Sequence, residues 1–96
     1  LHKNEEAIAD FDKALEADPK HFNSWYNKGV VLGSMGKNEE ALRAFNKATD
    51  LAPDEFNAWY NKGVTLRKLG HPEEAAKAFD KTLGVNPNEP KALVNR

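Results

Sequence analysis

The apolar positions of this chain follow a helical spacing, and the same spacing returns further along the sequence. Apolar and small residues three or four positions apart form two matching stripes: Phe22, Trp25, Gly29 and Leu32, then Phe56, Trp59, Gly63 and Leu66. Residues at this spacing lie on one face of an α-helix. Each stripe therefore predicts a helix that packs through one side.

A second kind of stripe, built on alanine and phenylalanine, occurs three times. Its members are Ala7, Phe11 and Ala14, then Ala41, Phe45 and Ala48, then Ala75, Phe79 and Thr82. No alternating strand pattern competes with these helical patterns. We expect helices at about residues 4–17, 22–35, 38–51, 56–69 and 72–84, and a short further helix from about residue 89.

Glycine and proline mark the ends of these segments. Gly36 and Gly70 follow the first kind of helix, where a left-handed residue costs least without a Cβ atom. Prolines follow the second kind and stop it, at Pro19, Pro53 and Pro87.

Helix starts are also predicted by residue type. Asn4 and Asn38 suit the N-cap position, whereas Pro72, at the equivalent place, suits the first helical residue. Paired glutamates in the first turn favour the positive end of the helix dipole, at Glu5–Glu6, Glu39–Glu40 and Glu73–Glu74.

The chain contains an internal repeat with a period of 34 residues. The pentapeptide WYNKG, for example, occurs at Trp25–Gly29 and again at Trp59–Gly63. Residues 22–55 match residues 56–89 at about half of their positions without a gap. Residues 1–21 align with the second half of a unit, and residues 90–96 with the start of one. We therefore expect one array of a half unit, two whole units and the beginning of another.

Composition limits the classes of function. The formal net charge is −1, so no long-range field favours nucleic acid or an anionic membrane, and no run of about 20 apolar residues predicts a membrane span. The chain has no cysteine, which excludes disulfides and thiolate zinc sites and fits the reducing cytoplasm. We expect a cytoplasmic protein with no membrane or nucleic-acid partner.

No metal-binding, phosphate-binding or catalytic motif is complete in this sequence. The three histidines, His2, His21 and His71, fall at turns and lack the spacing of a metal site. GSMGK at Gly33–Lys37 lacks the preceding strand and the serine or threonine of a phosphate-binding loop. No acid and base, and no serine or threonine with histidine, form a catalytic pattern. We expect no catalysis, no metal and no cofactor.

The repeated residues resemble the tetratricopeptide repeat family, whose W-x2-L-G-x2-Y…A-x3-F…P pattern has a 34-residue period. The matching residues are Trp25, Gly29, Ala41, Phe45, Ala48 and Pro53, then Trp59, Gly63, Ala75, Phe79 and Pro87, with Ala7, Phe11, Ala14 and Pro19 in the leading half unit. Lys28 and Lys62 stand where the family usually has leucine. We expect their stems to lie on the apolar face with the ammonium groups in water.

This resemblance implies an all-α fold, a right-handed superhelix of antiparallel helix pairs with a concave groove lined by the first helix of each unit. By the same resemblance, a peptide-binding groove would include Asn23, Tyr26, Asn27, Val30, Asn57, Tyr60, Asn61, Val64, Lys68, Lys91 and Asn95. The tyrosines and asparagines of WYNKG lie about a quarter turn from the Trp–Gly stripe. Packing within a unit is not expected to require them.

Two interpretations of the groove amides remain open. Asn27, Asn61 and Asn95 repeat an amide that can pair with a peptide backbone, as a ladder does in some members of the family. Alternatively, the asparagines bond to neighbouring helices and stabilise the stack. A clamp for a C-terminal carboxylate is not expected, because Tyr26 and Val30 stand where the family's clamp has lysine and asparagine.

Two functions follow. The first is a protein–protein interaction scaffold that binds an extended peptide segment of a partner in the groove. The alternative is a structural unit that stacks end to end, with copies of itself or with further repeats, through its terminal helix faces. The leading face of that stack would carry Ala7, Phe11 and Ala14, whose partner helix is not in this sequence.

Overall fold

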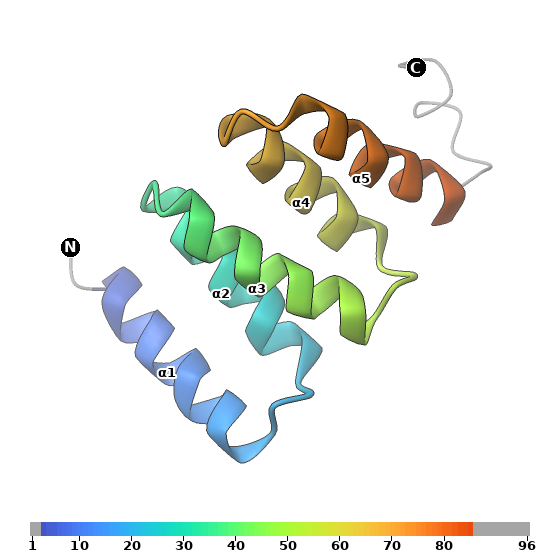
Figure 1. The fold of residues 1–96 in the computed structure, drawn as a ribbon. Helices are drawn as coiled ribbons and strands as arrows, with labels where there is room; N and C mark the ends of the chain where they lie inside the picture. Colours follow the sequence, from blue (N-terminus) through green and yellow to red (C-terminus); the bar gives the residue numbers. More distant parts are fainter. Residues whose placement is uncertain (1–2, 86–96) are drawn as a thin grey trace.

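The computed structural model describes the backbone of residues 3–85 and the side chains of residues 3–82, and this part of the chain is all-helical (Figure 1). Its helices are α1 (Lys3–Ala17), α2 (Phe22–Ser34), α3 (Asn38–Leu51), α4 (Phe56–Lys68) and α5 (Pro72–Val85). Each boundary lies within one residue of its predicted position. The helix predicted from residue 89 falls outside the described residues.

Successive helices run antiparallel and stack in chain order, so the principal extents are unequal at 39, 26 and 19 Å (Figure 1). The closest pairs are α2 with α3 and α4 with α5, while α1 packs on α2 and α3 packs on α4. The first helices of the two whole units, α2 and α4, also contact each other. None of the described helices has the length and apolar character needed to cross a bilayer.

In each whole unit the two helices pack closely at a point where a glycine of the first helix faces a phenylalanine ring of the second. A Cβ atom added at Gly29 would lie 2.6 Å from Cε1 of Phe45, and one added at Gly63 would lie 2.6 Å from Cε1 of Phe79. Real Cβ atoms essentially never approach a ring carbon this closely, so the missing side chain is what allows the helices to pack. The 34-residue repeat is therefore a repeat of one packing solution.

Both tryptophans make the same hydrogen bond to the backbone. The indole Nε1 of Trp25 donates to the carbonyl of Pro19 at 2.8 Å, and that of Trp59 donates to the carbonyl of Pro53 at 2.7 Å. Each bond ties the first helix of a unit to the proline turn that precedes it. The repeated tryptophan thus makes the same contact in both units.

Gly36 and Gly70 end their helices as predicted. Their φ angles are +79° and +85°, in the left-handed region that favours glycine. The following amides complete Schellman motifs, with Lys37 N donating to Leu32 O at 2.9 Å and the equivalent His71 N donating to Leu66 O at 2.9 Å.

The predicted asparagine caps are wrong. Asn38 is the first residue of α3, its N-cap is Lys37, and no side chain caps the helix; Asn4 lies inside α1. The acidic first turn supplies favourable charge without a capping side chain. A cap that the sequence did not indicate occurs at His21, whose Nδ1 accepts from Ser24 N at 3.2 Å.

The described large hydrophobic side chains that remain exposed are Val30, Phe56 and Tyr60, all on α2 or α4. Phe11 on the leading face of α1 is half-buried, although that face was expected to lack a partner. Because α1 already packs on α2, less apolar surface is exposed there than the sequence suggested. Self-association through this face stays a prediction.

Glycine-to-alanine substitutions within α2 test the packing solution. Gly29→Ala should lower the free energy of unfolding by roughly 1–3 kcal/mol, because the new methyl group collides with the buried Phe45 ring. Gly33→Ala is the matched control, since a Cβ there meets nothing closer than the Ala41 Cβ at 4.0 Å. It should raise stability by roughly 0.5–1 kcal/mol through helix propensity. Urea titration followed by circular dichroism measures both, and equal effects would contradict the close-packing explanation.

Candidate functional site

The predicted groove residues lie along α2 and α4, which are neighbours. The exposed members are Asn23, Asn27, Val30, Asn57, Tyr60 and Lys68, and the half-buried members are Tyr26, Asn61 and Val64. Lys91 and Asn95 lie outside the described residues. The structure therefore places nine of the eleven predicted residues on two adjacent helices.

One hydrogen bond joins the two units across this surface. The amide Nδ2 of Asn61 on α4 donates to the hydroxyl of Tyr26 on α2 at 2.8 Å. Asn61 keeps a second N–H and its Oδ1 for further bonds. At this position the amide stabilises the stack, which is one of the two interpretations that the sequence left open.

Tyr26 is also part of the packing, contrary to the expectation that packing within a unit does not require it. Its ring stacks on Phe22 with centroids 5.8 Å apart and meets the edge of Phe45 at 6.1 Å. The phenol contributes to the core cluster of Leu32, Ala41 and Phe45. The sequence missed this role because the quarter turn separating Tyr26 from the Trp–Gly stripe still leaves a large ring within reach of α3.

Tyr60, the equivalent residue on α4, is more accessible. Its side chain is 52% exposed, although its ring centroid lies 5.7 Å from that of Phe79. Val30 is 43% exposed on the same surface. Together with the exposed amides of Asn27 and Asn57, these side chains offer apolar contact and uncharged hydrogen-bonding groups.

A sizeable hollow lies elsewhere among the described residues. A cavity of about 680 Å³, called the first cavity below, opens between α1, α2 and α3 and contains none of the predicted groove residues. Its lining residues are Glu5, Ile8, Asp12, Trp25, Lys28, Leu32, Met35, Lys37, Glu40, Arg43, Ala44, Asn46, Lys47 and Asp50. Four cationic and four acidic side chains balance in this lining.

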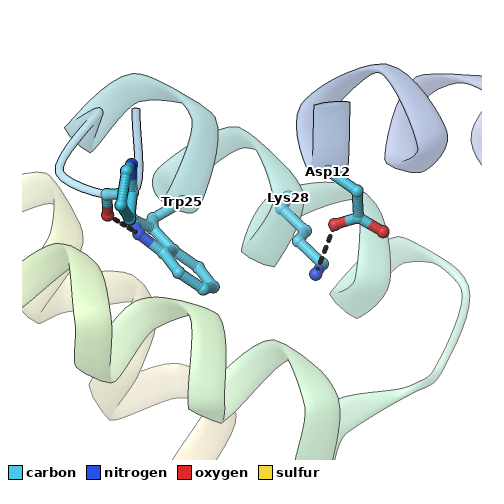
Figure 2. Close-up of polar contacts among 4 residues, drawn as sticks. Asp12, Trp25 and Lys28 are labelled. Carbon is cyan, nitrogen blue, oxygen red and sulfur yellow. Dashed lines mark hydrogen bonds and ion pairs between the residues drawn. The ribbon is translucent and has the colours of Figure 1, made fainter. Parts of the chain in front are cut away.

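Figure 2 shows the polar contacts beside the first cavity. Lys28 Nζ pairs with Asp12 Oδ1 at 2.6 Å, joining α2 to α1, and also lies 5.6 Å from the centroid of the Trp25 ring. Lys28 is half-buried, and its ammonium group contacts Asp12 and the Trp25 ring rather than water alone. The ion pair and the indole face compensate this partial burial.

A smaller cavity of about 210 Å³, called the second cavity below, repeats this arrangement between α4 and α5. Its lining residues are Trp59, Lys62, Leu66, Glu74, Lys77, Ala78 and Lys81. Lys62 Nζ lies 4.8 Å and Lys81 Nζ 5.9 Å from the centroid of the Trp59 ring. Burial lowers the pKa of Lys62, while Asp50 and Glu74 act in the opposite direction.

Lysine 62 differs from its counterpart in one respect. Within residues 3–82, no carboxylate lies within ion-pair distance of Lys62, whereas Lys28 has Asp12. The same part of the chain contains no group of three or more side chains suited to hold a metal ion. The surface along α2 and α4 thus presents exposed amides and a tyrosine ring, and the two cavities present tryptophan rings and charged side chains.

Comparison with known proteins agrees with this geometry. Residues 31–92 match one tetratricopeptide repeat family and residues 11–43 match a second family with the same description. No curated protein sequence matches the chain at a significant level.

Solved structures resemble the fold along nearly its whole length. A crystal structure of MamA superposes with a TM-score of 0.87 at 26% identity, covering 93% of this chain and 52% of that one. A further MamA structure, of the AMB-1 protein, gives 0.80 at 30% identity over 88% of this chain and 49% of that one. YrrB, described as a TPR protein with an unusual peptide-binding site, gives 0.83 at 27% identity over 99% and 49%. The chain spans about half the length of these structures.

Removing the bond between the units tests the structural role of the groove amide. Tyr26→Phe deletes the hydroxyl that accepts from Asn61 and keeps the ring, so the free energy of unfolding should fall by about 0.5–1.5 kcal/mol. The control is Asn27→Ala, which changes the equivalent but exposed amide on α2 and should alter stability by less than about 0.5 kcal/mol. Thermal unfolding of both variants and of the unchanged chain measures these effects. If Tyr26→Phe leaves the stability unchanged, the Asn61–Tyr26 bond does not stabilise the stack.

Proposed function

The chain belongs to the tetratricopeptide repeat family, and from this premise we propose that it binds an extended peptide segment of a partner protein along α2 and α4. The family and fold are those of protein-interaction scaffolds, which are generally not catalysts. Binding of a peptide on these two helices is the finer step. The observation that carries it is the exposure of large hydrophobic side chains on α2 and α4 and, among the side chains of residues 3–82, on no other helix.

Apolar contact would come from Val30 and Tyr60. An exposed tyrosine contributes a flat, rigid contact area at a small entropic cost, which is why this residue type is common at binding hot spots. Both side chains remain accessible, whereas Tyr26 is largely committed to packing and to Asn61. The peptide would therefore anchor chiefly on these two exposed residues.

Hydrogen bonds would come from the exposed amides. Asn27 presents a donor pair and an acceptor from one side chain, which suits the alternating N–H and C=O groups of an extended backbone. Asn61 retains half of its donor capacity beside it. The described groove positions hold one charged residue, Lys68, which favours a segment read through its backbone and apolar side chains rather than through charge.

The similarity to YrrB supports the proposal at the level of the class of ligand. That protein is described as having a peptide-binding site, and its fold covers 99% of this chain. The fold of this chain is therefore one on which a peptide-binding site occurs.

Selection from random peptides displayed on phage, followed by fluorescence anisotropy with the selected peptides, tests the proposal. Tyr60→Ala should weaken binding about tenfold, or about 1.4 kcal/mol, because it removes an accessible aromatic anchor. The variant should keep its helical circular dichroism, since Tyr60 is about half exposed.

A matched control is Glu16→Ala, an exposed position on α1 away from the groove, which should leave binding unchanged. If Tyr60→Ala and Val30→Ala bind the selected peptides as tightly as the unchanged chain does, the peptide lies elsewhere and the proposal fails. Light scattering at the working concentration shows whether the chain is a monomer, which separates peptide binding from stacking between copies.

A further inference from the structure

The two cavities share one construction but differ in charge. Each has a tryptophan wall, a lysine over the indole ring and a leucine beside it, at positions 34 residues apart. Cations and anions balance in the first cavity, whereas the second is lined by three lysines and one glutamate. Even with Asp50 counted, the second cavity keeps an excess of positive charge.

One change in the repeat contributes to this difference. The residue 34 positions after Asp12 is Asn46, and the residue 34 positions after Lys28 is Lys62. The first unit therefore has an ion pair of 2.6 Å where the second has lysine and a neutral amide. The second unit therefore has the lysine but lacks the carboxylate that pairs with the equivalent lysine in the first.

Two observations at the second unit agree with a missing anion. Within residues 3–82, no carboxylate lies within ion-pair distance of Lys62. Burial also lowers the pKa of Lys62, because the nearby Asp50 and Glu74 do not compensate it fully. An ammonium group that is desolvated and incompletely paired is stabilised by an added negative charge.

We propose that the second cavity binds a carboxylate side chain from an acidic peptide segment of a partner protein. The charge of the lining selects an anion. Trp59, Leu66 and Ala78 give the cavity an apolar wall beside the lysines. That combination fits a carboxylate on a short aliphatic stem better than a phosphate, which has no apolar part to cover the indole.

This site is distinct from the proposed groove. Trp59, Lys62 and Leu66 lie on a different side of α4 from Tyr60 and Val64, which follow a quarter turn or more around the helix. The cavity is completed by α5, which supplies Lys77 and Lys81. A partner could therefore occupy this face independently of a peptide on the groove.

The chain carries its own reporters for a test by NMR. Its two indole N–H groups belong to Trp25 and Trp59, one in the lining of each cavity. Blocked hexaglutamate peptide, added to the labelled intact chain at low salt, should shift the Trp59 resonances and leave those of Trp25 nearly unchanged. Blocked hexaglutamine and inorganic phosphate are the comparison ligands, and neither should reproduce the shift. Added salt should weaken the binding, since charges draw the ligand in.

Reciprocal variants at the differing position give the sharpest test. Asn46→Asp puts a carboxylate at the position of the repeat equivalent to Asp12, so hexaglutamate affinity at Trp59 should fall about tenfold and the pKa of Lys62 should rise. Asp12→Asn removes the internal anion from the first cavity, so Trp25 should begin to respond to hexaglutamate. Lys62→Met should abolish the response at Trp59.

Several outcomes would overturn the inference. Equal shifts at Trp25 and Trp59 in the unchanged chain, or an unchanged Trp59 response in Asn46→Asp, would mean that the missing anion does not create the site. A response to phosphate as strong as that to hexaglutamate would exclude the carboxylate assignment. Circular dichroism and the Trp Nε1 hydrogen-bonded shifts confirm that each variant is folded before its binding is judged.

Discussion

The structure depends on the contact between a glycine and a phenylalanine ring inside each helix pair. Gly29 and Gly63 leave the space that Phe45 and Phe79 fill, and an ideal Cβ atom at either glycine would lie 2.6 Å from the facing ring. This contact fixes how closely two helices approach, and everything on the outer faces is positioned by it. Because the glycine–phenylalanine distance is the same in the second unit, both helix pairs have the same packing geometry.

Between units the contacts are less regular than within them. The tryptophan bonds to Pro19 and Pro53 are the same in both units, but Asp12 pairs with Lys28, whereas the residue equivalent to Asp12 in the next unit is the neutral Asn46. The difference lies between helix pairs and leaves the glycine–phenylalanine contact within each pair unchanged. The two units thus share one scaffold and differ in local charge.

The fold could be predicted almost entirely from the sequence, and the site only in part. Helix bounds, the left-handed Gly36 and Gly70 and the equivalence of the tryptophans follow from local periodicity and residue type. The Tyr26–Asn61 bond and the first cavity do not, because each depends on the angle between helices and on side-chain rotamers that spacing leaves undetermined. The asparagine caps were wrong for the opposite reason: residue type favours them, but α3 begins at Asn38 itself and α1 begins before Asn4.

The bond between Asn61 and Tyr26 has a mechanical consequence. It spans the two units at 2.8 Å, so it restrains the bend of the superhelix at this junction. A guest molecule that captured the same amide hydrogen would release the phenol and relax that restraint. Occupancy would then alter the curvature of the array, and a longer assembly of such units could transmit the presence of a bound segment along its axis as a change in shape.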